Sequence, residues 1–232
     1  MSESNSLLRP RTIRSFVCRA GRLTPGQERA LTQLWPRYGV ASHDTMIDIN
    51  TLFGRKAPTV LEIGFGNGQS LLAMAANAPE TNFIGIEVHR PGIGALLTGI
   101  DEMHLTNVRI FQADAIQVLQ QAIPDHSLQA VYLFFPDPWH KKRHHKRRIV
   151  QPEFVQLVQR KLIANGTLHM ATDWQEYAEH MLATMENNAN FSNQAGAGNY
   201  SAKPDYRSTT KFEQRGERLG HGVWDLIFSS KK

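Results

Sequence analysis

The alternation of apolar and polar residues predicts strands and helices that follow one another along most of the chain. Five apolar runs have the length of strands, at 60–63, 83–88, 108–112, 131–135 and 168–171. A segment with helical periodicity follows each of them, at 69–78, 91–104, 114–122, 152–163 and 174–187. Since parallel strands need a crossover between them, this order predicts an α/β fold with a Rossmann-like, doubly wound, mostly parallel sheet. A last apolar run at 223–228 is expected to add an antiparallel strand.

The beginning of the chain departs from this pattern. Residues 1–22 show no periodicity and are rich in Ser and Arg, so they are predicted to form a mobile basic arm. Thr24, Pro25 and Gln27 are typical of a helix start with a capping box, and this helix is expected to end at Pro36. Residues 23–232 are then predicted to form a single domain with one core.

Positive charge is concentrated in two stretches. Residues 141–148 contain six Lys and Arg and no acid, and residues 1–22 contain five Arg against one Glu. Without these stretches the formal charge changes from +5 to −5. An acidic body with a local cationic patch indicates that a polyanion docks on the patch. The alternative is a solvated face that binds nothing, which is the more common meaning of such a run.

Carboxylates stand at or near the ends of four successive predicted strands, namely Glu62, Glu87, Asp114 and Asp137. Because open α/β sheets bind ligands at the carboxyl ends of their strands, this series indicates a binding site. Each acid taken alone would more often cap a helix or face solvent. The turn Gly64-Phe65-Gly66-Asn67-Gly68 lies between the first strand and its helix, where glycines let the backbone approach a nucleoside.

The fourth strand leads into a turn of unusual composition. Pro136 and Pro138 enclose Asp137, so this carboxylate is held in a stiff segment. Trp139 follows, and the basic run begins directly after it. One turn is therefore expected to join an acidic site to a strongly cationic surface.

These motifs resemble those of known families. Glu62-x-Gly64-x-Gly66-x-Gly68, Glu87 and Asp114 resemble the S-adenosylmethionine site of class I methyltransferases, a pattern that many of these enzymes share. The turn 134–139 with Lys141-Lys142-Arg143-His144 is similar, more narrowly, to that of bacterial tRNA (guanine-N7-)-methyltransferases. The segment Thr210-Lys211-Phe212-Glu213 resembles the C-terminal substrate motif of that family. The resemblance extends from about residue 55 to the end.

The resemblance implies a cofactor, a reaction and a role for each motif residue. It implies methylation of guanine N7 in the variable loop of tRNA, with Asp137 as the catalytic residue. The implied S-adenosylmethionine contacts are Glu62, Gly64, Gly66, Gly68, Glu87, Asp114 and Asp137. The implied substrate contacts are Lys141, Asp173, Thr210, Lys211, Phe212 and Glu213. The implied RNA contacts are Arg143, His144, His145, Lys146, Arg147 and Arg148, and Trp139 is placed to stack on a base.

The residue types suit this chemistry. Guanine N7 carries a lone pair and no proton, so attack on a sulfonium methyl group needs no general base. The protein has to align the reacting atoms, which can contribute about 7–11 kcal/mol to the lowering of the barrier. The base becomes positively charged on transfer, and a nearby carboxylate stabilises that charge. We therefore expect Asp137 to act by position and electrostatics.

Three other functions are weighed against this one. A methyltransferase for an exocyclic amine of DNA or RNA would have an aromatic residue after two prolines, whereas Trp139 follows Asp137-Pro138 directly. A non-catalytic RNA-binding protein of the same fold would not need the carboxylate series. A dinucleotide-binding dehydrogenase is disfavoured because Gln69 occupies the position of its third glycine.

Composition adds a few expectations. A single cysteine, Cys18, excludes an intramolecular disulfide and is typical of the cytoplasm. No signal region or membrane-spanning run is present, and no metal site is expected although His144 and His145 are adjacent. No interface stripe stands out, so we expect a monomer, with an oligomer as the alternative. Trp174 and the stripe after it are expected to pack in the core.

Overall fold

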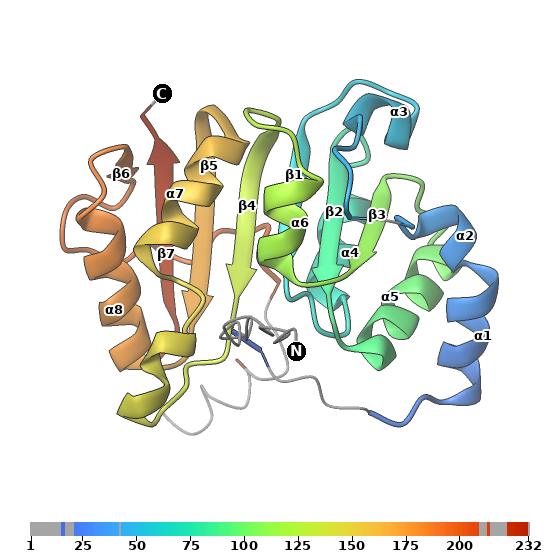
Figure 1. Cartoon of the computed structure of the whole chain (residues 1–232), viewed down its shortest axis with the longest axis horizontal. Helices are drawn as coiled ribbons and strands as arrows, with labels where there is room; N and C mark the ends of the chain where they lie inside the picture. The colour runs from blue at the N-terminus through green and yellow to red at the C-terminus, as the bar shows by residue number, and fades with distance from the viewer. Residues whose placement is uncertain (1–14, 17–20, 42, 209–212, 214–221, 232) are drawn as a thin grey trace, which may run out of the picture.

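The computed structural model describes residues 15–16, 21–41, 43–208, 213 and 222–231. Within these residues, seven strands form one sheet in the order β3-β2-β1-β4-β5-β7-β6 (Figure 1). The strands are β1 Thr59–Ile63, β2 Asn82–Glu87, β3 Val108–Gln112, β4 Leu128–Phe134, β5 Leu162–Thr172, β6 Phe191–Asn193 and β7 Trp224–Ser230. β1 to β5 are parallel, and β7 is antiparallel to both β5 and β6. The predicted fold class, mostly parallel with an antiparallel last strand, is confirmed.

Helices cover both faces of the sheet (Figure 1). The helices are α1 Pro25–Gln33, α2 Trp35–Tyr38, α3 Ile49–Phe53, α4 Gln69–Asn77, α5 Arg90–Glu102, α6 Ala115–Gln121, η1 Lys142–Arg147, α7 Pro152–Lys161 and α8 Gln175–Glu186. Apolar residues of α6, α7 and α8 pack against one face, and those of α1, α4 and α5 pack against the other. The two apolar layers explain why the parallel strands are mostly apolar and do not alternate strictly between apolar and polar residues.

The chain reverses its winding between β1 and β4. β1 pairs with β2 on one side and with β4 on the other, with Ile63 opposite Ile86 and Leu133. The connection after β1 leads to β2, whereas the connection after β4 leads to β5 in the opposite direction. The loops after β1 and β4 therefore diverge. A crevice forms at such a switch point, outside the carboxyl ends of the strands.

Two local features differ from the sequence expectation. β5 begins at Leu162, directly after α7, because Leu162 pairs with Leu128 before a register shift. The polar residues in the first half of that strand hid it from the apolar pattern. Pro36 does not stop the first helical region; it lies in the first turn of the short α2, where a proline needs no amide hydrogen. Most of the predicted arm, and most of the polar segment before β7, lies outside the described residues.

Replacing Thr24 by Ala tests the cap of α1. The Thr24 hydroxyl accepts a hydrogen bond from the Gln27 amide at 3.2 Å, and the Gln27 side chain accepts one from the Thr24 amide at 2.9 Å. Loss of the hydroxyl should lower the free energy of unfolding by about 1 kcal/mol, measured by urea denaturation. Thr24→Ser keeps the cap and should stay within a few tenths of a kcal/mol of the wild type. Equal losses in both variants would show that the cap contributes nothing.

Candidate active site

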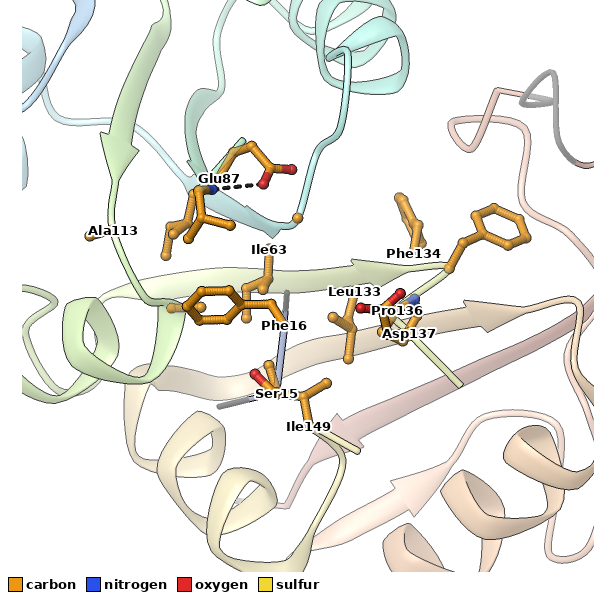
Figure 2. A pocket seen from close by; sticks show the side chains of 15 residues that line it. Ser15, Phe16, Ile63, Glu87, Ala113, Leu133, Phe134, Pro136, Asp137 and Ile149 are labelled. Atoms are coloured by element: carbon orange, nitrogen blue, oxygen red, sulfur yellow. Dashed lines mark hydrogen bonds between the residues drawn. The ribbon is translucent and has the colours of Figure 1, made fainter. Parts of the chain in front are cut away.

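The crevice at the switch point is lined by residues at the ends of β1, β2, β3 and β4, the four strand ends that the sequence singled out. We call it the switch-point cleft; its lining includes Gly64, Glu87, Ala113, Ala115, Phe134, Phe135, Pro136 and Asp137. Ser15 and Phe16, from the beginning of the chain, complete it. In Figure 2 the Phe16 side chain lies between Glu87 and Ile149. The beginning of the chain and the turn after β4 therefore meet at one edge of the sheet, although they lie far apart in the sequence.

The glycine turn between β1 and α4 has a backbone that other residues rarely adopt. Gly64, Gly66 and Gly68 have φ of +73°, +57° and +78°. A side chain at Gly68 would also meet Leu96 at 2.7 Å, so this glycine lets α4 pack against α5. Positions 64 and 66 face open space, which leaves their backbone accessible to a ligand.

Glu87 fastens the glycine turn to the end of β2. One carboxylate oxygen accepts a hydrogen bond from the Gly66 amide at 2.9 Å. The other accepts from the amides of Val88 and His89 at 2.7 and 3.0 Å. A carboxylate has about four acceptor positions, so three are filled and room remains for one further donor.

Glu62 is the most perturbed group of the site. Its side chain is 3% exposed, and its Oε2 has no hydrogen-bond partner among the described residues. Burial, and then the nearby Glu87 charge, raises its pKa to about 8. Glu62 lines a second hollow, the glycine-turn cleft, together with Gly64 to Ser70, Phe134, Phe135 and Asp173. A buried acceptor without a donor is what a cleft for a positively charged group presents.

Asp114 has a different local role from the other three acids. Its carboxylate accepts a hydrogen bond from the Ile116 amide at 2.8 Å and caps α6. Its two neighbours, Ala113 and Ala115, line the switch-point cleft. Asp114 therefore caps a helix, as single acids often do, at a position next to the switch-point cleft.

Asp137 lies in a turn with strained backbone at both ends. Phe135 and Trp139 have φ of +52° and +48°, values that non-glycine residues seldom adopt. Asp137 is exposed, and it lines both the switch-point cleft and an adjoining hollow. We call this hollow the basic groove; its lining includes Glu87, His89, Asp137, Trp139, His140, Lys141 and His144. The carboxylate thus stands where the acidic and the basic regions meet.

The basic run after the turn divides into exposed and buried members. Lys141, Lys142, Arg143 and Lys146 are exposed, and His144, His145 and Arg147 are half-buried. The Arg147 guanidinium lies 3.7 Å from the centre of the Trp139 ring. Partial burial, and then the surrounding cations, lowers the pKa of His144. The described residues contain no group of three His, Cys, Asp or Glu that could hold a metal ion.

Arg148 is a correction to the grouping made from sequence. It is 3% exposed and is therefore not part of the exposed cationic surface. Its Nε donates to the Pro138 carbonyl at 2.9 Å, and its Nη2 lies 3.3 Å from the Glu176 carboxylate. The guanidinium also lies over the Tyr177 ring at 4.9 Å. Arg148 therefore ties the Asp137 turn to α8, a role that a run of like charges cannot reveal.

The residues implied to bind substrate are only partly described. Lys141 lines the basic groove, and Asp173 lines the glycine-turn cleft, so both adjoin the site. Thr210, Lys211 and Phe212 lie outside the described residues. Glu213 is 1% exposed, and its carboxylate is paired with Arg207, which the sequence analysis missed. Trp174, expected in the core, is 38% exposed and its ring contacts that of His140.

The fold and the clefts define the class of protein. The structure is similar to the 16S rRNA methyltransferase KamB, with a TM-score of 0.59 and 14% identity over 84% of this chain and 99% of that one. It is also similar to a precorrin-6y C5,15-methyltransferase from Geobacter metallireducens, with a TM-score of 0.51 and 12% identity over 89% and 87% of the two chains. The fold is that of the class I methyltransferases.

Sequence comparison narrows this class. A family model named Methyltransf_4, "Putative methyltransferase", matches residues 56–226. A tRNA (guanine-N(7)-)-methyltransferase of Hydrogenovibrio crunogenus is 58% identical over 94% of this chain and 91% of its own length. One of Pseudomonas aeruginosa is 58% identical over 94% and 89%. The chain belongs to this methyltransferase family. Among the described residues, no helix is long and apolar enough to cross a membrane.

The raised pKa of Glu62 predicts how stability depends on pH. Between about pH 4.5 and 8 the folded protein holds this proton while the unfolded chain releases it, so stability falls as the pH rises through this window. Glu62→Gln cannot titrate, so its free energy of unfolding should fall less steeply, with a difference of up to about 1.4 kcal/mol per pH unit. Urea denaturation of the ligand-free proteins from pH 5 to 9 measures this.

The exposed Glu153 on α7 provides the matched control, because Glu153→Gln changes the same chemical group without the burial. Its stability should follow the wild type over the whole pH range. Parallel curves for Glu62→Gln and the wild type would contradict a raised pKa at Glu62.

Proposed function

We propose that this protein transfers a methyl group from S-adenosylmethionine to N7 of a guanine in the variable loop of tRNA. The observation that carries the proposal is the position of Asp137. It lines the cleft beside Glu87 and the glycine turn, and it also lines the basic groove. The proposed cofactor site and polyanion surface therefore share two carboxylates, Glu87 and Asp137, of which Asp137 lies in the turn that leads into the basic run. The names of the relatives support guanine N7 of tRNA as the acceptor.

The residues around the glycine turn fit the cofactor. When bound, S-adenosylmethionine supplies an electrophilic methyl group on a sulfonium. Glu62 offers an unpartnered buried oxygen to an ammonium group, and the exposed backbone at Gly64 and Gly66 can approach the ligand closely. Glu87 has one acceptor position for a ribose hydroxyl while it holds the turn. Asp114 and Gly68 would contact the cofactor as well: Asp114 lies between two residues that line the switch-point cleft, and Gly68 lines the glycine-turn cleft.

Two exposed carboxylates would act on the guanine. Asp137 lies where the switch-point cleft meets the basic groove, and Asp173 lines the glycine-turn cleft. Because guanine N7 carries no proton, neither carboxylate has a proton to remove there. Each can accept hydrogen bonds from the base and stabilise the positive charge that the base gains. Their contribution is thus to orient the acceptor and to stabilise the product.

The exposed cations would hold the RNA. Lys141, Lys142, Arg143 and Lys146 project from η1 and the residue before it, next to the basic groove. Trp139 Nε1 donates to the Ser15 carbonyl at 3.1 Å, and Arg147 Nη2 to that of Phe16 at 3.3 Å. Ser15 and Phe16, two described residues of the predicted basic arm, therefore lie beside the same surface. We expect residues 23–232 to act as one methyltransferase domain, monomeric and in the cytoplasm.

Methylation of unmodified tRNA tests the function. Incubation with labelled cofactor, followed by digestion to nucleosides, should give 7-methylguanosine. Asp137→Asn keeps the shape of the side chain but removes its charge, so the rate at saturating tRNA should fall on the order of 100-fold. The tRNA dissociation constant should change by less than about twofold. Label on N6 of adenosine, or none in the wild type, would refute the proposal.

Lys146 and Arg148 provide a matched pair of cations from one short segment. Lys146 is exposed, whereas Arg148 holds the Asp137 turn. Lys146→Ala should reduce the salt dependence of tRNA binding by about one unit of logarithmic slope and leave the saturated rate unchanged. Arg148→Lys keeps the charge but loses the hydrogen bonds and stacking, so the rate should fall about tenfold with an unchanged slope. The opposite assignment of effects would place the RNA against Arg148.

A further inference from the structure

Arg207 is a buried arginine in the middle of the polar segment before β7. It is 1% exposed, and its guanidinium has carboxylates on two sides. Nε and Nη2 donate to the two oxygens of Asp225, both at 2.7 Å. Nη1 and Nη2 donate to the two oxygens of Glu213 at 2.8 and 2.9 Å. Both pairs are bidentate, the geometry that fixes orientation most firmly.

The same guanidinium reaches the turn that carries Asp137. Its central carbon lies 5.6 Å from the centre of the Phe135 ring, and Phe135 is one of the two residues of this turn with strained backbone. Asp225, on β7, is paired with Ala171 on β5, two residues before Asp173. One side chain therefore connects the turn after β4, the sheet beside Asp173, and the chain at Glu213.

The surroundings of Arg207 form a closed polar cluster. Asp225 Oδ1 lies 2.7 Å from His169 Nε2, and His169 Nδ1 lies 2.9 Å from the Tyr206 hydroxyl. Lys203 Nζ lies 3.5 Å from Glu213, so two cations face two carboxylates. Such a cluster is stable only when it is complete, because each buried charge depends on its counter-charge.

We propose that Arg207 is a positioning residue that seats the chain at Glu213 against the Phe135 turn, and that Glu213 acts through Arg207 rather than by touching the guanine. This inference rests on the proposed function, because it assigns a role in that reaction. The Glu213 side chain is 2% exposed, and each of its oxygens accepts from Arg207. A carboxylate placed in this way positions the neighbouring chain; it does not read a base.

The inference predicts how variants of the pair behave on two substrates. The substrates are tRNA with guanosine and tRNA with inosine at the methylated position; inosine lacks the exocyclic amine. Arg207→Lys and Glu213→Gln should each lower the saturated rate about tenfold or more, and the double variant should lose no more than the worse single one. The guanosine-to-inosine rate ratio of Glu213→Gln should equal that of the wild type.

Two binding measurements and a control separate positioning from general damage. The dissociation constants for tRNA and S-adenosylhomocysteine should stay within about twofold of the wild type, because neither Arg207 nor Glu213 lines the basic groove or the switch-point cleft. Glu153→Gln, at an exposed glutamate of α7, should behave as the wild type in every assay. If Arg207→Lys does not fold, the guanosine-to-inosine ratio of Glu213→Gln still decides.

Two results would overturn the inference while the proposed function stands: additive losses in the double variant, or a guanosine-to-inosine ratio that collapses in Glu213→Gln. Either would mean that Glu213 contacts the base independently of Arg207. A wild-type protein that makes no 7-methylguanosine would instead overturn the proposed function, and this inference with it.

Discussion

The site depends on the strained turn between β4 and η1, which the rest of the structure holds in place. Phe135 and Trp139 both have left-handed backbone, and such residues cost on the order of 1–3 kcal/mol each. Arg148 fastens the turn on one side through the Pro138 carbonyl, and Arg207 lies over Phe135 on the other. Two buried guanidinium groups thus support a conformation that the turn would not adopt alone. This conformation places Asp137 between the switch-point cleft and the basic groove.

Glu62 and the cations of η1 lie at different depths near this turn. Glu62 is buried and holds its proton up to about pH 8, while the cations of η1 face solvent. A positively charged ligand in the glycine-turn cleft would favour the ionised form of Glu62, since an opposite charge lowers the pKa of a carboxyl. A polyanion on the basic surface is attracted over a distance of about one Debye length, near 8 Å at physiological salt. In the proposed function, the cationic cofactor and the anionic RNA therefore bind side by side in two separate environments.

The fold and half of the site could be predicted from the sequence, because their signals are local. Strand–helix alternation identified the parallel sheet, and the position of Glu62, Glu87 and Asp137 at strand ends brought them to one edge. Two parts could not be predicted. Arg148 is indistinguishable from its neighbours in a run of six cations, because only the fold decides which of them is buried.

Arg207 was missed for a different reason. It lies in a segment without hydrophobic periodicity, and its partner Asp225 comes from a strand 18 residues further on. Pairing over such a distance leaves no pattern in the sequence. The same holds for the first half of β5, where polar residues continue a strand because Leu162 finds a partner in Leu128. In both cases the tertiary contact, and not the local composition, determines the structure.

The glycine turn and the residues beyond β4 differ in how closely they determine the reaction. One fold can carry many different reactions, so the sheet and its helices do not by themselves determine the reaction. In the proposed function the glycine turn binds the cofactor whatever the acceptor is, and Glu87 lines both the switch-point cleft and the basic groove. In the proposed function, selectivity for the acceptor comes from residues beyond β4, namely Asp137, the cations of η1 and Glu213, which Arg207 holds. These elements are joined to one another by the two buried arginines, so a change in acceptor would require the turn and both of its supports to change together.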